Sequence, residues 1–246
     1  MPQQNESNRN LWILGVKPDE GREHIISSYL EAGGYNCCLE SPEHLASGRP
    51  LGIVLDISPF SDDGWGVLLR IKSDPAIRDI PVLPIFLSEK GKLGGVFPVA
   101  GFFTLPIDQH YLLERLAVLG LTEEAETWDL QALVVSRTGE ELVSKVLESI
   151  SYEVVKGYTG MEGLALIAIK PKYLAFCSLM MGDMSAFELQ DKLRLIPYCR
   201  NTPLFVLLKS ELKEMEKRAM SREIAHLVSK KQLSCEEFLR FLRRRE

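Results

Sequence analysis

The chain has 246 residues, of which 46% are hydrophobic and 26% charged, and its formal net charge is −5 at pH 7. These values are ordinary for a globular protein and supply enough apolar residues for one or two cores. The acidic balance does not support nucleic-acid binding, which usually needs a basic face. Because no run of about 18 apolar residues occurs, we expect no membrane span. The polar residues 1–10 indicate a disordered leader without a secretory signal.

The cysteines favour a reducing compartment. Their number is odd, at 5, and no two have the spacing of a metal site. Cys37 and Cys38 are adjacent and would point to opposite faces of a strand. We therefore expect reduced thiols in a cytoplasmic protein, with a redox switch as the alternative.

The same order of strands and helices occurs twice. In the first half, apolar runs predict strands at 11–16, 35–39, 52–56, 81–87 and 101–105, and a helix follows at 108–119. In the second half, strands are predicted at 131–136, 152–156, 173–178, 203–208 and 225–229, with a last helix at 234–245. Apolar strands that alternate with helices predict parallel sheets covered on both faces. The predicted fold class is α/β, with two flavodoxin-like doubly wound domains of strand order 2-1-3-4-5, at 11–121 and 130–246, joined by a linker at 122–129.

The two halves differ in the segment between the fourth and fifth strands. The second half has the helical sequence SELKEMEKRAMSREI, whereas residues 89–100 of the first half are rich in glycine and contain Pro98. Glycine and proline both disfavour helix interiors. We therefore predict that the fourth helix of the first domain is short or missing.

Several stretches resemble bacterial response-regulator receiver domains. These are VLDISPFSDDGWGVLLRIKSDPAIRDIPVLPI at 54–85, FFTLPID at 102–108 and SLMMGDMSAFEL at 178–189. In that family an Asp at the end of the third strand accepts a phosphoryl group. The resemblance implies a tandem pair of receivers in a bacterial two-component pathway.

Receiver chemistry uses an acidic pair that holds Mg²⁺ with the acceptor Asp, and a Thr or Ser and a Lys that contact the phosphoryl oxygens. In the first half these positions fall on Gly15 and Val16, Asp56, Phe86 (or Ser88 if the strand is offset) and Leu105. In the second half they fall on Ser136 and Arg137, Ser178, Leu208 and Lys230. Each half keeps one of the five groups, so both are expected to be pseudo-receivers without cofactor or bound Mg²⁺.

Asp56 is the candidate phosphoacceptor. The alternatives are a remnant acid at a strand end and a different ligand-binding role, because ligands favour this edge of open α/β sheets. The neighbouring Asp62 and Asp63 favour a cap of the next helix over a cation site. No catalytic constellation is present, so we expect no enzyme.

These observations predict a phosphorylation-independent signalling adaptor that docks to a signalling protein, such as a histidine kinase or a polarity or chemosensory component. The alternative is a phosphorelay regulator phosphorylated at Asp56 by a histidine kinase.

In the family the docking surface is the fourth helix, fifth strand and fifth helix. The candidate interface residues are Val96, Phe97, Phe102, Arg222, Arg240 and Arg243. An apolar patch at Val96, Phe97 and Phe102 would be buried against the second domain or against a second copy of the chain in a homodimer. Neither nucleic acid nor membrane is expected as a partner.

Overall fold

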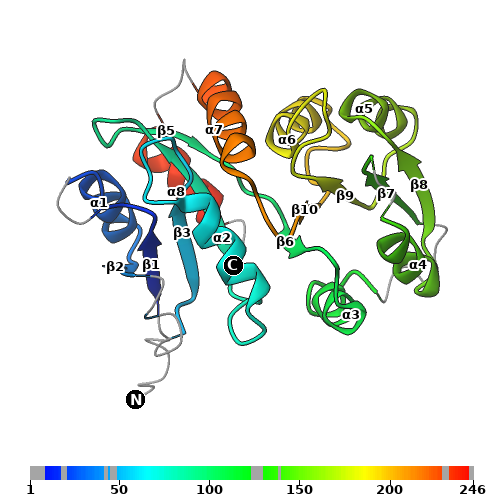
Figure 1. Ribbon diagram of the computed structural model, residues 1–246, viewed down its shortest axis with the longest axis horizontal. Coiled ribbons are helices and arrows are strands. Elements are labelled where there is room, and N and C mark those ends of the chain that lie inside the picture. The colour runs from blue at the N-terminus through cyan, green and yellow to red at the C-terminus, as the bar shows by residue number, and fades with distance from the viewer. Residues whose placement is uncertain are drawn as a thin grey trace. The chain divides into compact units, whose positions relative to one another are not determined.

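The computed structural model describes residues 9–17, 21–41, 44, 49–122, 130–137, 140–228 and 233–243 (Figure 1). The leader predicted at 1–10 and the linker predicted at 122–129 lie almost wholly outside these residues. None of the described helices is both long and apolar enough to cross a bilayer.

The chain forms two compact units. Unit 1 combines residues 1–98 with residues 211–246, and unit 2 is the continuous segment 99–210. The chain therefore passes from one unit to the other twice.

Unit 1 contains a five-stranded sheet in the order β2-β1-β3-β4-β5. Its strands are β1 (Asn10–Leu14), β2 (Asn36–Leu39), β3 (Gly52–Asp56), β4 (Val82–Leu87) and β5 (Leu93–Val96). All pairings are parallel except that of β5, which runs antiparallel to β4. Cys37 of β2 is half-buried and Cys38 is exposed, as expected for neighbours on a strand.

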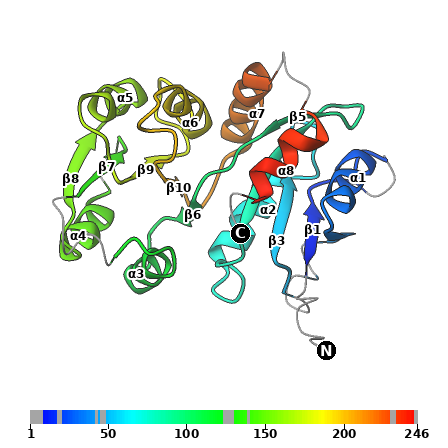
Figure 2. The ribbon, with the colours of Figure 1, turned by 180° about the vertical axis from the view of Figure 1, so that it is seen from behind.

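Helices cover both faces of this sheet. They are α1 (His24–Ala32), α2 (Gly64–Ser73), α7 (Glu214–Val228) and α8 (Cys235–Arg243). One hydrophobic core joins α1 and α8 to the sheet through Ile26, Leu30, Phe238 and Leu239. Helices α2 and α8 lie on opposite faces of it (Figures 1 and 2).

Unit 2 contains a second five-stranded sheet, entirely parallel, in the order β6-β10-β9-β7-β8. Its strands are β6 (Gly101–Thr104), β7 (Gln131–Val135), β8 (Glu153–Gly157), β9 (Leu174–Ser178) and β10 (Leu204–Leu208). Its helices are α3 (Gln109–Val118), α4 (Glu141–Ser149), α5 (Gly160–Ile169) and α6 (Ala186–Leu195). Three aromatic rings, of Phe103, Phe176 and Phe205, meet in its core.

The α/β fold class is confirmed, but the predicted domain boundaries are wrong because the halves exchange their last elements. Strand β6, predicted as the fifth strand of the first domain, pairs with β10 in unit 2, where Phe102 lies opposite Val206. Helix α3 follows β6 and contributes Tyr111, Leu112 and Leu116 to the core of unit 2. Helices α7 and α8, predicted in the second domain, belong to unit 1.

The strand predicted at 225–229 is also wrong, since these residues up to Val228 continue α7. Met220, Ile224 and Val228 are buried and four residues apart, which is the spacing of one helix face. A short apolar run cannot by itself distinguish a buried helix from a strand. The fifth strand of unit 1 is instead the antiparallel β5.

The missing fourth helix of the first half is confirmed, because residues 93–96 form β5. Glycine allows a close approach here: a Cβ atom on Gly95 would lie 2.4 Å from Cγ1 of Val228 in α7. The apolar patch predicted at Val96, Phe97 and Phe102 is covered within the chain, and Phe102 pairs with Val206 of the second half. Val96, Phe97 and Phe102 are only 6%, 4% and 3% exposed, and Val96 lies in the core of unit 1. Helix α7 from the second half packs against β5 at this point.

Candidate functional site

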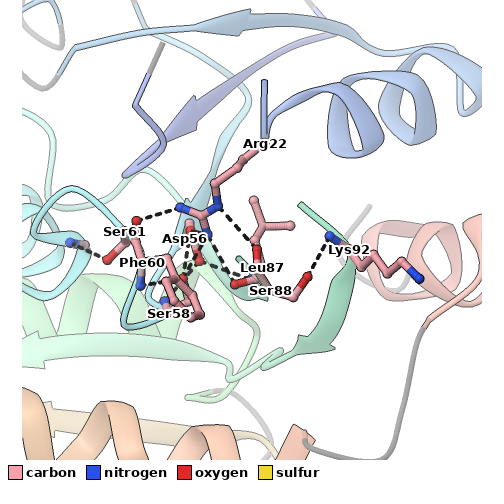
Figure 3. A network of polar contacts seen from close by, with 9 residues as sticks. Arg22, Asp56, Ser58, Phe60, Ser61, Leu87, Ser88 and Lys92 are labelled. Carbon is pink, nitrogen blue, oxygen red and sulfur yellow. Dashed lines mark hydrogen bonds and ion pairs between the residues drawn. The ribbon is translucent and has the colours of Figure 1, made fainter. Parts of the chain in front are cut away.

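The candidate site of unit 1 is built around Asp56, the last residue of β3 (Figure 3). Its side chain is 0% exposed. Oδ1 accepts hydrogen bonds from the backbone amides of Ser58 at 3.0 Å and Leu87 at 3.2 Å. Oδ2 accepts from the hydroxyl of Ser58 at 3.0 Å and from Nη2 of Arg22 at 2.8 Å. Both oxygens are therefore already occupied by groups of the protein itself.

Arg22 provides the counter-charge. It lies in the loop before α1 and reaches Asp56, with its side chain only 4% exposed (Figure 3). The guanidinium also donates to the carbonyl oxygens of Phe60 at 2.6 Å, Leu87 at 3.2 Å and Ser88 at 3.3 Å. Its Cζ lies 5.7 Å from the centre of the Phe60 ring. These contacts fix the guanidinium beside Asp56, at the carboxyl end of β3.

The contacts of Asp56 are those of an ionised carboxylate. Burial raises the pKa of the Asp56 carboxyl above its usual value, and the amide of Ser58, the charge of Arg22 and the amide of Leu87 offset part of this rise. Two of the donors are backbone amides, which cannot accept, and a third is a permanently charged guanidinium. The buried cation and the buried anion thus require each other.

The backbone leaves no room for an acidic pair beside Asp56. Gly15 has a φ of +78°, and a Cβ atom there would lie 2.6 Å from the backbone oxygen of Asp56. Val16 points into the core, where it is 6% exposed. No group of three or more His, Cys, Asp or Glu side chains in the described ranges could hold a metal ion.

The loop after β3 is also closely packed. Asp63 caps α2 by accepting from the amide of Gly66 at 3.2 Å, as the sequence predicted. A Cβ atom on Gly64 would lie 2.0 Å from the backbone oxygen of Asp56, so only glycine fits at that position. The Asp-Gly-Trp-Gly sequence thus brings the start of α2 against the end of β3.

Because the halves exchange elements, the receiver positions predicted for one half of the sequence do not all belong to one unit. Phe86 lies in β4 and is 7% exposed, so the hydroxyl position of unit 1 is apolar. Leu105 follows β6, and its amide donates to the carbonyl of Leu208 at 2.8 Å. Leu105, predicted at the Lys position of the first half, therefore belongs to unit 2 with Leu208. Lys230, predicted at the corresponding position of the second half, lies outside the described residues.

In unit 2 the acceptor position carries a hydroxyl instead of a carboxylate. The Ser178 hydroxyl donates to that of Ser136 at 3.0 Å, and the Ser136 hydroxyl donates to Oε1 of Glu140 at 3.2 Å. Arg137, the other residue predicted at the acidic pair, is exposed. The guanidinium of Arg137 lies near Gly182, where a Cβ atom would be 3.3 Å from Cζ. A hydroxyl chain of this kind provides no ready phosphoacceptor.

A carboxylate nearby has a structural role. Asp183 accepts from the amides of Gly160 at 2.8 Å and Met161 at 2.9 Å, at the start of α5. Burial acts to raise the pKa of the Asp183 carboxyl, but the amides of Met161 and Gly160, with those of Asp183 and Met184, lower it below its usual range.

We expect Asp183→Ala to reduce the free energy of unfolding of unit 2 by about 1 kcal/mol near neutral pH, because two helix amides lose their acceptor. A lowered folded-state pKa means that this stabilisation is present above the usual pKa of an aspartate and is lost as the pH falls through the folded-state pKa. Urea unfolding followed by circular dichroism at neutral and acidic pH measures the difference. Asp183→Asn is the matched control, since it keeps an acceptor oxygen. A loss that did not shrink on acidification would contradict this explanation.

Arg22 was not found by sequence reasoning. It lies in a stretch of polar residues, DEGREH, which reads as a solvated loop. Nothing in the local pattern marks one charged residue of such a loop as buried, since the burial depends on the distant Asp56. Asp56 is retained although Gly15 and Val16 cannot bind a metal ion. This combination could have suggested that a cation of the protein pairs with Asp56.

The basic interface candidates lie on unit 1 rather than on a separate second domain. Arg222 of α7 and Arg240 of α8 are exposed, and the side chain of Arg243 lies outside the described residues.

No protein-family model matches this sequence, and no curated protein matches it significantly. Several solved structures are similar to part of it, including the following two. A protein assigned as a response regulator from Chloroflexus aurantiacus J-10-fl is 15% identical over 42% of this chain and 100% of that one, with a TM-score of 0.31. The receiver domain of the sensor histidine kinase PA1611 from Pseudomonas aeruginosa PAO1 is 13% identical over 40% of this chain and 99% of that one, with a TM-score of 0.31. The latter structure has a magnesium ion in its active-site cleft.

Proposed function

We propose that this chain is a phosphorylation-independent signalling adaptor of two-component or chemosensory type, which acts by docking to a partner protein and not as an enzyme. The observation that carries the proposal is the Arg22–Asp56 ion pair, at 2.8 Å between Nη2 and Oδ2. It occupies the place where a phosphorylated receiver would bind its metal ion and phosphoryl group. The site is thus closed by the protein's own cation.

Two further features support the proposal. A nucleophilic carboxylate must expose a lone pair to the donor phosphorus, and both oxygens of Asp56 are engaged by four hydrogen bonds from the protein. Mg²⁺ would supply several kcal/mol of charge stabilisation in phosphoryl transfer, and Gly15 and Val16 cannot bind it. Unit 2 offers Ser178 in place of the acceptor.

The second candidate is a phosphorelay regulator. The observation that favours it is the position of Asp56 itself, a carboxylate at the carboxyl end of the central strand β3. Phosphorylation there would require Arg22 to withdraw, and the freed guanidinium would then be available to bind the phosphoryl oxygens.

A small phosphodonor separates the two functions. We expect the intact protein, incubated with acetyl phosphate and Mg²⁺ and measured by mass spectrometry, to show no added phosphoryl group. The reason is that Oδ1 is held by the Ser58 and Leu87 amides and Oδ2 by Arg22 and the Ser58 hydroxyl, so neither oxygen is free to attack the donor. Arg22→Ala is the matched variant in which the carboxylate is uncovered. Asp56→Asn controls for modification at other residues.

A phosphoryl group that appears on the wild-type chain and is absent in Asp56→Asn would overturn the adaptor function in favour of the phosphorelay. If the wild-type chain stays unmodified, capture of a partner from the native cell by both wild-type and Asp56→Asn chains would support docking that is independent of phosphorylation.

A further inference from the structure

A polar cleft of about 420 Å³ lies in unit 1 beside the loop that follows β3. Its volume is within the range of about 300–1,000 Å³ that is usual for small-molecule sites. One wall is the loop and the start of α2, including Ser58 and Gly64, and the other wall is one face of α7. Neither Asp56 nor Arg22 lines the cleft. It therefore adjoins the closed carboxylate site, with which it shares Ser58.

The charges around the cleft are unequally paired. Lys217 contacts Oδ1 of Asp63 at 2.7 Å and Oε1 of Glu214 at 3.1 Å, so these three charges satisfy one another in part. Arg218 and Arg222 also line the cleft and are exposed. Within the described part of the chain, neither of them makes an ion pair or a hydrogen bond. Two guanidinium groups, one helical turn apart on α7, are thus available to an anion.

A largely buried serine lines the same space. Ser221 lies one turn after Lys217, lines the cleft and is only 8% exposed. Its hydroxyl makes no hydrogen bond to any described residue. An oxygen atom of a ligand in the cleft would accept a hydrogen bond from it.

We propose that this cleft binds a small phosphate-bearing ligand. Guanidinium groups donate two parallel hydrogen bonds to phosphate oxygens, which Arg218 and Arg222 are free to do. The hydroxyl of Ser221 would donate to a further oxygen. The proposal goes beyond the adaptor function and does not depend on it.

The probe for this site is inorganic pyrophosphate, titrated into the full chain by calorimetry at constant ionic strength, without Mg²⁺ or phosphodonor. We expect saturable binding that becomes at least tenfold weaker in the double variant Arg218→Ala/Arg222→Ala and a few-fold weaker in Ser221→Ala. Arg240→Ala, which removes an exposed arginine of α8 away from the cleft, is the matched control and should bind like the wild type. Because both cleft arginines are exposed, their removal should leave the thermal unfolding transition in place.

A gain of affinity provides a second readout that a structural role would not produce. Glu214→Gln removes one acceptor of Lys217 at an exposed position and should tighten pyrophosphate binding several-fold. The proposal is overturned if no saturation occurs up to about 10 mM pyrophosphate, or if the double variant binds as tightly as the wild type. Neither result bears on whether Asp56 is phosphorylated, so failure of this site and failure of the adaptor function are distinguishable.

Discussion

The segment 99–210, expressed alone, is expected to fold cooperatively, whereas the segment 130–246 is not. The shorter segment contains all five strands of unit 2 and the helix α3. The segment 130–246 lacks β6 and α3, and with them the core residues Phe103, Tyr111, Leu112 and Leu116. Burying one such side chain contributes about 1.5–3 kcal/mol, so losing several of them is comparable to the whole stability of a small domain, about 5–15 kcal/mol.

Circular dichroism, thermal unfolding and the dispersion of amide signals in NMR spectra test the fragments directly. Two fragments allow the same comparison for unit 1. A fusion of residues 1–98 to 211–246 through a flexible linker should fold, while residues 11–121 should not, because that fragment lacks α7 and α8. Cooperative folding of both 11–121 and 130–246 as monomers would show that the halves do not need the exchanged elements.

Removing one member of the Arg22–Asp56 pair should reduce the free energy of unfolding of unit 1 by about 3–5 kcal/mol, because the partner is left as an uncompensated buried charge. Arg22→Ala leaves the carboxylate without its cation. Asp56→Asn keeps an oxygen for the amides of Ser58 and Leu87 but leaves the guanidinium, 4% exposed, without its anion. The double variant Arg22→Met/Asp56→Asn should lose much less than the sum of the single variants, since no unpaired charge remains.

Tryptophan fluorescence during urea unfolding measures this loss in unit 1. Trp12 and Trp65 are both buried there, at 9% and 3% exposed, and the third tryptophan, Trp128, lies outside the described residues and can be replaced by phenylalanine in every variant. Arg70→Ala removes an exposed arginine of α2 and should change stability by no more than about 0.5 kcal/mol. Additive losses in the double variant would mean that the two side chains act independently.

The local features of the fold could be predicted from the sequence because they depend on short-range chemistry. The run GIVLD placed Asp56 at the end of a buried strand, and Gly94, Gly95 and Pro98 excluded a helix at 89–100. Asp63 could be recognised as a cap because it precedes the first apolar turn of α2. In each case the residues that decide the structure are neighbours in the chain.

The exchange between the halves could not be predicted, because it depends on which of two similar sheets a strand joins. The sequence GFFT of β6 is apolar and suits the open edge of either sheet, and its pairing with β10 is a long-range choice. Arg22 was missed for the same reason, since it lies 34 residues away from Asp56 in sequence. Burial of a charged residue becomes visible only when its partner is in place.

The order of biosynthesis gives the exchanged topology a further consequence. Chains are made from the amino terminus, and domains commonly fold in that order. Here the middle segment, 99–210, is complete when its last strand leaves the ribosome, whereas the first 98 residues must wait for α7 and α8 at the carboxyl end. During that interval the sheet of β1 to β5 lacks two of its covering helices. The nascent protein therefore finishes its second unit before its first, and a truncated product that stops after β10 would present the unfinished apolar face of unit 1 to chaperones and proteases.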